Sequence, residues 1–181
     1  MTYTIRPART SDVRVIRKLI DANVDSGRLL SKATVTLYED IQEFVVAELT
    51  DDPVSPADGS ARSAAAPSLV GCGAVHVLWE DLAELRTVAV RSDCHGQGIG
   101  HGIVASLIDR SRQLGVARVF VLTFAVDFFG AHGFRPIKGT PVAPDVYQEL
   151  LRSYDEGVAE FLDLERVKPN TLGNTRMLLH L

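Results

Sequence analysis

One stretch decides the fold of this chain: Glu84-Leu-Arg-Thr-Val-Ala-Val90, followed by Arg91-Ser-Asp-Cys-His-Gly-Gln-Gly-Ile-Gly100. The valine-rich run at residues 84–90 predicts a strand, and the chain then turns with glycines at positions 96, 98 and 100. The apolar residues that follow recur at helical spacing and predict an amphipathic helix ending near residue 114: Ile103, Val104, Leu107, Ile108 and Leu114. Glycines let backbone amides turn inward, and a helix start adds N–H groups that lack an intrahelical acceptor. This glycine turn (residues 91–100) therefore predicts a phosphate or pyrophosphate site.

The composition is that of a globular protein. The chain has 181 residues, 46% of them hydrophobic and 23% charged, which predicts one domain over residues 1–181. The net charge of −4 argues against a nucleic-acid partner, since such a surface must be basic. Neither a run of about 18 apolar residues nor a signal peptide is apparent, so we expect no membrane partner and a cytoplasmic location. Cys72 and Cys94 lack metal-site spacing, so we expect reduced thiols and no metal.

The remaining signals alternate between strands and helices. We expect strands over residues 3–7, 44–49, 69–78, 83–90, 118–123, 134–137 and 175–181. We expect helices over residues 13–24 with an end near Ser26 and Gly27, and over 36–41, 127–132, 145–154 and 156–164. Residues 51–67 are rich in Pro, Ala, Ser and Asp and predict a mobile loop. Gly71 and Gly73 predict a bulge or a close backbone approach. This order predicts an α/β protein.

Two motifs resemble the GNAT superfamily of N-acetyltransferases. Val88-Ala89-Val90 with His95-Gly-Gln-Gly-Ile-Gly100 is similar to the family's acetyl-CoA signature. Phe128-Phe-Gly-Ala-His-Gly-Phe134 is similar to the later signature Phe-Tyr-x-x-x-Gly-Phe, at the separation the family shows. The resemblance implies a single domain in which helices flank a mixed central sheet, with the acetyl-CoA site at the glycine turn.

The resemblance implies acetyl-CoA as the co-substrate. Backbone amides of the turn would hold its pyrophosphate, and residues 88–90 would pair with the pantetheine arm. His95 stands where the family usually has a basic or amide residue. The implied coenzyme residues are Val88, Ala89, Val90, His95, Gly96, Gln97, Gly98, Ile99, Gly100 and Phe129.

A rival interpretation of the same glycines is dinucleotide binding. Gly100-x-Gly102-x-x-Ala105 formally matches the nicotinamide-dinucleotide fingerprint. These residues lie inside the predicted helix, however, and no acidic residue ends the next strand until Asp127. The sequence therefore favours the acetyl-CoA interpretation.

A closer likeness is to the acetyltransferase domain of N-acetylglutamate synthases. Residues 84–90, 112–123 and 128–134 resemble that domain, as do Leu29-Leu-Ser-Lys32 and Asn174-Thr-Arg176. Those enzymes commonly carry an amino-acid-kinase domain as well, so this chain resembles the short, stand-alone kind. The likeness implies acetylation of the α-amino group of L-glutamate or L-glutamine, the first step of arginine biosynthesis.

Acetyl transfer to an amine requires a base, an oxyanion donor and a proton for the leaving thiolate. The resemblance places the general base at Glu84, and a backbone N–H near Val88 is the expected oxyanion donor. Phe129 replaces the tyrosine that usually acts as the acid in the family. Thr123 aligns with a hydroxyl that the synthases use near the thiolate, so the resemblance implies Thr123 as the candidate acid or relay, with a water relay equally open.

Recognition of an amino-acid acceptor requires fixed cations, preferably arginine. The implied acceptor-binding residues are Leu30, Lys32, Arg86, Thr87, Asn174 and Arg176. The synthases often carry paired arginines where this chain has Gly173 and Asn174, so glutamine stays open beside glutamate.

Two alternatives remain open. One is a GNAT acetyltransferase for another amine, such as a protein N-terminus, a polyamine or a drug. The other is a non-catalytic acetyl-CoA-binding module, which Phe129 and His95 would favour. The sequence also leaves the oligomeric state open, with a homodimer as one option.

Overall fold

The structure is a computed structural model that describes residues 2–24, 29, 31–50, 68–164 and 173–181. The chain divides into two compact units. The first consists of Met1–Gly73 and Thr87–Ser106, and the second consists of Ala74–Arg86 and Leu107–Leu181. The predicted loop at 51–67 and the predicted helix end at Ser26 and Gly27 lie outside the described residues. One domain over the whole chain stays a prediction.

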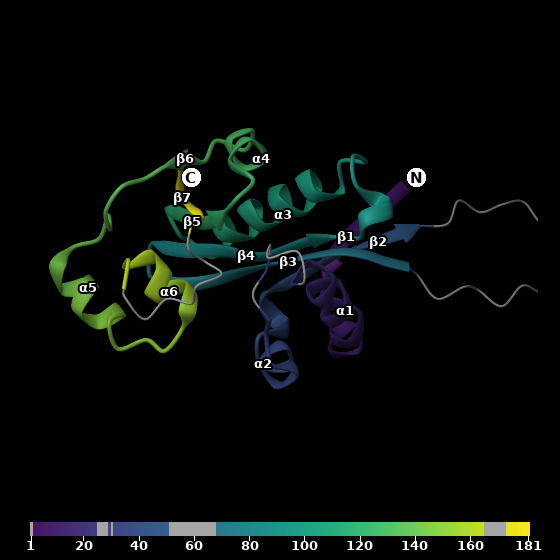
Figure 1. Ribbon diagram of the computed structural model, residues 1–181, viewed down its shortest axis with the longest axis horizontal. Coiled ribbons are helices and arrows are strands. Elements are labelled where there is room, and N and C mark those ends of the chain that lie inside the picture. Colours follow the sequence, from purple (N-terminus) through teal and green to yellow (C-terminus); the bar gives the residue numbers. More distant parts are fainter. Residues whose placement is uncertain (1, 25–28, 30, 51–67, 165–172) are drawn as a thin grey trace, which may run out of the picture. The chain divides into compact units, whose positions relative to one another are not determined.

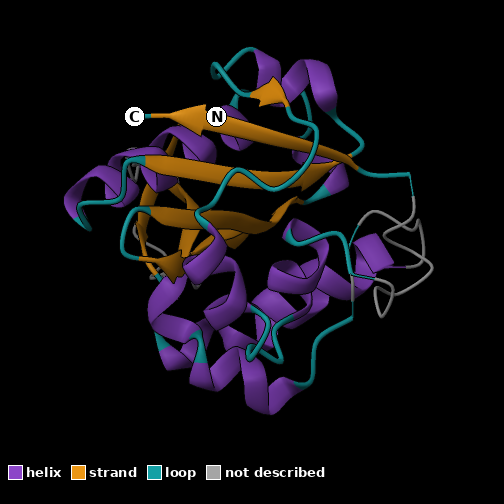
Figure 2. Ribbon diagram, turned by 90° about the vertical axis from the view of Figure 1, so that its left-hand side faces the viewer, coloured by secondary structure: helices purple, strands orange, loops and turns teal. Residues whose placement is uncertain are grey.

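The described strands form a mixed sheet in the order β1-β2-β3-β4-β5-β7-β6. The pairs β1–β2, β5–β7 and β6–β7 are antiparallel, whereas β4–β5 is parallel. Helices flank the sheet (Figure 2), so the predicted fold is confirmed. The strands are β1 (Thr2–Pro7), β2 (Phe44–Thr50), β3 (Ser68–Trp79), β4 (Leu82–Val90), β5 (Arg118–Thr123), β6 (Arg135–Pro136) and β7 (Thr175–His180).

The helices begin close to where the sequence predicts them. They are α1 (Val13–Val24), α2 (Thr34–Glu39), α3 (Ile99–Gln113), α4 (Val126–Gly130), α5 (Pro144–Leu150) and α6 (Glu156–Phe161). α5 ends four residues earlier than expected. The Ser153 backbone N–H donates to the Leu150 carbonyl oxygen, and the Ser153 hydroxyl accepts from the Asp155 N–H. These local bonds compete with continuation of the helix.

In the first unit, α1 and the beginning of α3 lie on opposite faces of the strands (Figure 1). α1 buries Val13, Ile16, Leu19 and Ile20, the stripe its helical spacing predicts. On the other face, a Cβ added at Gly71 of β3 would lie 2.8 Å from Ile103 Cδ1. The predicted close approach at Gly71 is therefore confirmed, and the neighbour is the helix that follows the glycine turn.

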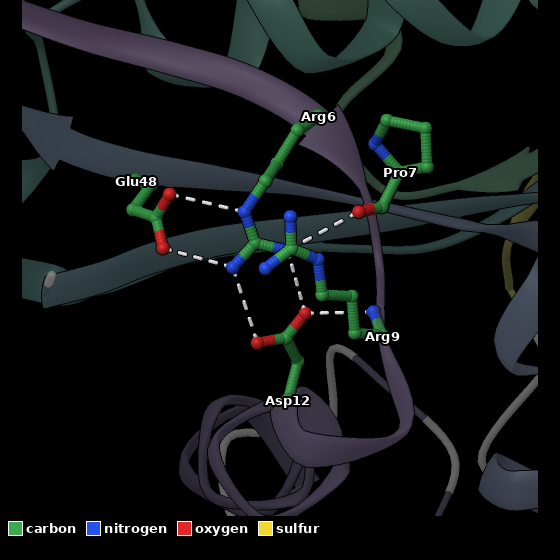
Figure 3. A network of polar contacts seen from close by, with 5 residues as sticks. All are labelled: Arg6, Pro7, Arg9, Asp12 and Glu48. Atoms are coloured by element: carbon green, nitrogen blue, oxygen red, sulfur yellow. Dashed lines mark hydrogen bonds and ion pairs between the residues drawn. The ribbon is translucent and has the colours of Figure 1, made fainter.

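A polar network joins the edge strand β1 to the rest of the first unit (Figure 3). Arg6 donates from Nη1 to Asp12 Oδ2 at 2.7 Å and from Nη2 to Glu48 Oε1 at 2.8 Å. Asp12 also accepts from the Arg9 backbone N–H at 2.7 Å. The hydrogen bonds from Arg6 hold the pKa of Asp12 and the pKa of Glu48 below their ordinary values. One guanidinium thus connects β1, β2 (through Glu48) and the 3-10 turn Thr10–Asp12.

In the second unit, β5 lies between β4 and β7. Leu82–Leu85 of β4 pair with Arg118–Val121, and the whole of β5 pairs with β7. One face of these strands packs against α5 and α6 in a cluster around Phe120, whose ring meets that of Phe161 edge-on at 4.9 Å. Neighbouring strand residues point to opposite faces: Leu178 belongs to this cluster, while Leu179 lies against Gly133.

Within the described part of the chain, every helix is too short or too polar to cross a membrane.

We predict that Arg6→Gln destabilises the fold by about 1–3 kcal/mol at pH 7, because it leaves two carboxylates without their common partner. Since both carboxyl pKa values are depressed in the folded state, this stabilisation is complete above about pH 5 and is lost as the pH falls through the depressed values. The difference from wild type should therefore shrink in acid. Urea unfolding at pH 7 and at about pH 3 measures both effects.

The control is Arg152→Gln, which removes an exposed ion pair with Glu149. Such pairs contribute at most about 0.5 kcal/mol. Equal unfolding free energies in the two variants would contradict the importance of the Arg6 network.

Candidate active site

The glycine turn has the backbone conformation that its sequence predicts. Gly96 has φ +76° and Gly98 has φ +78°, values that residues with a Cβ adopt only with strain. α3 begins at Ile99, and the Gly102 N–H donates to the Gly98 carbonyl at 3.0 Å. The amides at the start of α3 precede this bond, and the first N–H groups of a helix point out of its end. Backbone N–H groups so arranged suit an anion.

Tyr3 of β1 supports this turn. Its hydroxyl donates to the Gly98 carbonyl at 3.2 Å, and a Cβ added at Gly102 would lie 2.7 Å from the same hydroxyl. The carbonyl and N–H of a trans peptide point in opposite directions. Holding the Gly98 carbonyl toward Tyr3 therefore directs the Ile99 N–H away from Tyr3. Sequence reasoning missed Tyr3, because it precedes the turn by more than ninety residues.

The side chains of the turn bond to nearby backbone. His95 Nε2 lies 2.9 Å from the Val90 carbonyl oxygen, and Gln97 Nε2 donates to the Asp93 carbonyl at 3.4 Å. Both side chains are exposed. The structure thus places His95 against the last residue of β4, and a phosphate contact from its ring stays a prediction.

Thr87 lies within β4, just before the predicted pantetheine residues. It is buried with φ +59°, an unusual conformation for a β-branched residue. Cys72 Sγ lies 3.7 Å from the Thr87 carbonyl oxygen. Strained residues of this kind concentrate at functional sites. Beyond Thr87, Ala89 is buried, whereas Val88 and Val90 are half-buried.

In the second unit, Glu84 and Arg86 come together with a residue that the sequence reasoning missed. Glu84 is 4% exposed, and its Oε2 lies 3.8 Å from Arg86 Nη1. Arg86 Nη1 donates to Asp155 Oδ2 at 2.7 Å, and His76 Nε2 lies 3.9 Å from the same oxygen. We call Glu84, Arg86 and Asp155 the Glu84 cluster.

α6 begins at this cluster. Asp155 is the N-cap of the helix, and its Oδ1 accepts from the Val158 N–H at 3.1 Å. Burial raises the pKa of Asp155, but the charge and hydrogen bond of Arg86 outweigh burial and bring it below its ordinary value. Asp155 is therefore a carboxylate at neutral pH. An aspartate just before a helix is a typical N-cap that the sequence alone can indicate. The ion pair between Asp155 and Arg86 joins residues far apart in the chain and leaves no such local signal.

Thr123 and Phe129 also lie in the second unit. Thr123 is buried at the end of β5, and its Oγ1 accepts from the Ala125 N–H at 2.9 Å, so the hydroxyl proton can be donated elsewhere. Phe129 is buried and meets Phe128 and Phe134 edge-on, with centroids 5.1 and 5.5 Å apart.

The other residues predicted to bind the acceptor come from both units. Lys32 is half-buried, and its carbonyl accepts from Arg17 Nη1. Arg176 donates to the Phe161 carbonyl at 3.4 Å and pairs with Asp163 at 3.5 Å, which places it beside the end of α6. Asn174 is half-buried just before β7, and Leu30 lies outside the described residues.

Among the residues that the structure describes, His, Cys, Asp and Glu side chains form no group of three suited to a metal ion. Cys72 and Cys94 are both buried free thiols, and burial raises the pKa of Cys72 to about 12.

The fold and the glycine turn define an acyltransferase, and the comparisons agree. Residues 33–134, more than half of the chain, match the acetyltransferase (GNAT) family, and the chain belongs to that family. It is 54% identical over 176 residues to the amino-acid acetyltransferase of Mycobacterium tuberculosis, a match covering 97% of this chain and 92% of that protein. The prediction of an acetyltransferase enzyme is confirmed.

Solved structures agree with this assignment. The crystal structure of Rv2747 from Mycobacterium tuberculosis, in complex with CoA and NLQ, has a TM-score of 0.85 and 52% identity, covering 98% of this chain and 99% of that one. N-acetylglutamate synthase from Neisseria gonorrhoeae, complexed with coenzyme A and N-acetyl-glutamate, has a TM-score of 0.71 at 22% identity. That match covers all of this chain but 35% of the synthase, and it shows a shared fold.

We predict that Gly98→Ala weakens coenzyme A binding about tenfold or more, because a Cβ at φ +78° forces the turn to change shape. Gly115→Ala is the matched control: Gly115 has φ +82° after the end of α3 and, like Gly98, open space around an added Cβ. Both variants should lose about 1 kcal/mol of stability. Calorimetry should show normal coenzyme A binding for the control alone; equal affinities in both variants would contradict this role for the turn.

Proposed function

We propose that the chain is an amino-acid N-acetyltransferase, which transfers the acetyl group of acetyl-CoA to the α-amino group of L-glutamate or L-glutamine and so begins arginine biosynthesis. The observation that carries the proposal is the 54% identity, over nearly the whole of both chains, to a protein named amino-acid acetyltransferase. The buried carboxylate of Glu84 supplies chemistry that suits this activity.

The glycine turn is the proposed site for the coenzyme. Its amides at residues 97–100 would bind the pyrophosphate, and Val88, Ala89 and Val90 would pair with the pantetheine arm. The positive φ angles of Gly96 and Gly98 support this role, because they direct the chain from β4 into the start of α3. The presence of CoA in the Rv2747 structure supports the same co-substrate.

Glu84 is the proposed general base. An α-ammonium group has a pKa of about 8, so one proton must leave before the nitrogen can attack. In the proposed step, Glu84 takes that proton, and the nitrogen forms a bond to the acetyl carbon, whose oxygen becomes the oxyanion that the backbone N–H near Val88 stabilises. The carbon–sulfur bond then breaks. The departing thiolate takes a proton from Thr123 or from water, and that donor is reprotonated by the second proton that the nitrogen loses as the amide forms.

The acceptor's carboxylate is proposed to bind the cationic and polar residues Lys32, Arg86, Thr87, Asn174 and Arg176. Leu30 completes the predicted set but lies outside the described residues. Arg86 already donates to Asp155. A guanidinium has five N–H donors, so it can hold an internal and an external carboxylate together. Asn174 would suit the side-chain amide of glutamine.

The test of the proposal is thiol release from acetyl-CoA with L-glutamate, L-glutamine, polyamines and an N-terminal peptide as acceptors. We expect turnover with one or both amino acids, and Glu84→Gln should lower kcat at least 100-fold because it removes the base. Glu80→Gln, at an exposed carboxylate on the turn before β4, should keep normal kcat. Full activity of Glu84→Gln would overturn the assigned base, and a preference for polyamines would overturn the assigned acceptor.

We also predict that Asn174→Arg shifts the acceptor preference toward glutamate, since an added guanidinium favours a carboxylate over an amide. The ratio of kcat/KM for glutamate to kcat/KM for glutamine should rise at least fivefold. An unchanged ratio would exclude Asn174 from the acceptor's side-chain contacts.

A further inference from the structure

Gly157 in the first turn of α6 lies directly against the Glu84 carboxylate. A Cβ added at Gly157 would lie 2.1 Å from Glu84 Oε2 and 2.9 Å from Oε1. A contact that short is sterically impossible, so a larger residue at this position would displace the carboxylate or the helix. The backbone of α6 therefore forms one wall around Glu84.

Asp155 holds this wall in place through two contacts. Its Oδ1 caps the helix at Val158, and its Oδ2 accepts from Arg86, whose strand also carries Glu84. The ion pair is largely buried, because the Arg86 side chain is 10% exposed. Asp155 precedes Gly157 by two residues, so fixing Asp155 fixes the first turn of α6 over Glu84.

We propose that Asp155 is a positioning residue for the base: through its pair with Arg86 and its cap on α6, it keeps Gly157 against Glu84 and balances the Arg86 charge that Glu84 experiences. The inference rests on the proposed function only in calling Glu84 the base. The positioning itself is a property of the Glu84 cluster, and it can be measured without turnover.

The charges around Glu84 predict the direction in which the pH of its protonation shifts in each variant. Arg86 favours the ionised form of Glu84 from 3.8 Å. Asp155 neutralises Arg86, His76 lies 3.9 Å from Asp155, and α6 also carries Glu160, three residues beyond Gly157. Removing the Asp155 charge leaves Arg86 uncompensated and should shift protonation of Glu84 to lower pH. Removing the Arg86 charge leaves Asp155 uncompensated and should shift it to higher pH.

The experiment is a pH titration of the full chain labelled with ¹³C at the glutamate side-chain carboxyl, in which the Glu84 signal is assigned by its loss in Glu84→Gln. Asp155→Asn keeps a good N-cap but removes the charge, and it should lower the Glu84 midpoint by about 0.5–1 pH unit. Arg86→Gln should raise it by a similar amount. Asp81→Asn, which removes the Arg118 pair at 2.7 Å, is the matched control and should leave the midpoint unchanged. Repeating the titrations with His76→Gln separates the contribution of His76.

The close contact between Gly157 and Glu84 is tested by Gly157→Ala. This variant should lower kcat at least tenfold while leaving coenzyme A affinity within about twofold. The matched control is Gly130→Ala in α4, where an added Cβ meets nothing within 4 Å. Midpoint shifts of the same sign or of zero in Asp155→Asn and Arg86→Gln, or a fully active Gly157→Ala, would overturn the positioning role. Midpoint shifts as expected in a protein that acetylates no amino acid would instead uphold the positioning role and overturn the proposed function.

Discussion

The structure around β4 depends on one constraint, the burial of the Glu84 carboxylate. A charged group removed from water is stable only if other charges and hydrogen bonds compensate it. Arg86, on the same face of the strand two residues later, lies 3.8 Å away, but this cation is itself mostly buried and binds Asp155. The compensation therefore extends from β4 to the start of α6. A strand that carries a buried acid is thereby connected to a helix seventy residues further along the chain.

The second constraint lies in the backbone. Gly96 and Gly98 adopt left-handed conformations that let the chain leave β4 and begin α3 within a few residues. Gly71 lets α3 approach β3, since a methyl group there would meet Ile103. Tyr3, near the N-terminus, donates a hydrogen bond to the Gly98 carbonyl and so helps to hold this peptide. Gly96 and Gly98 lack a side chain because of their backbone conformation, whereas Gly71 lacks one because α3 lies close to it, and together they shape the turn that suits a phosphate.

Local signals predicted much of this structure. The strand at 118–123 and the helix start at 13 appear where the sequence predicts them. The buried residues of α1 recur at helical spacing, and β5 is a short apolar run in which four of six residues are buried. The glycine turn could be recognised in the sequence because its positive φ angles favour glycine at positions 96 and 98. The ends of α5 and α6 were predicted too late, since local hydrogen bonds end these helices rather than apolar spacing. The Ser153 hydroxyl accepts from the Asp155 N–H after α5, and the Leu164 N–H donates to the Ala159 carbonyl after α6, where Asp163 has φ +59°. The family resemblance was also correct, because two motifs at fixed separation carry it.

By itself, the sequence determined the order of the strands and helices, the conformation of the glycine turn and the family, since each depends on residues that are neighbours along the chain. The tertiary structure alone decided that Arg86 faces Asp155, that Gly157 lies against Glu84 and that Tyr3 supports Gly98. Those contacts join residues about 70 to 95 positions apart. The physical reason is that a buried charge needs a compensating group close to it, and a close backbone contact needs a neighbour without a side chain. The local spacing of residues carries no information about which distant residue meets either need.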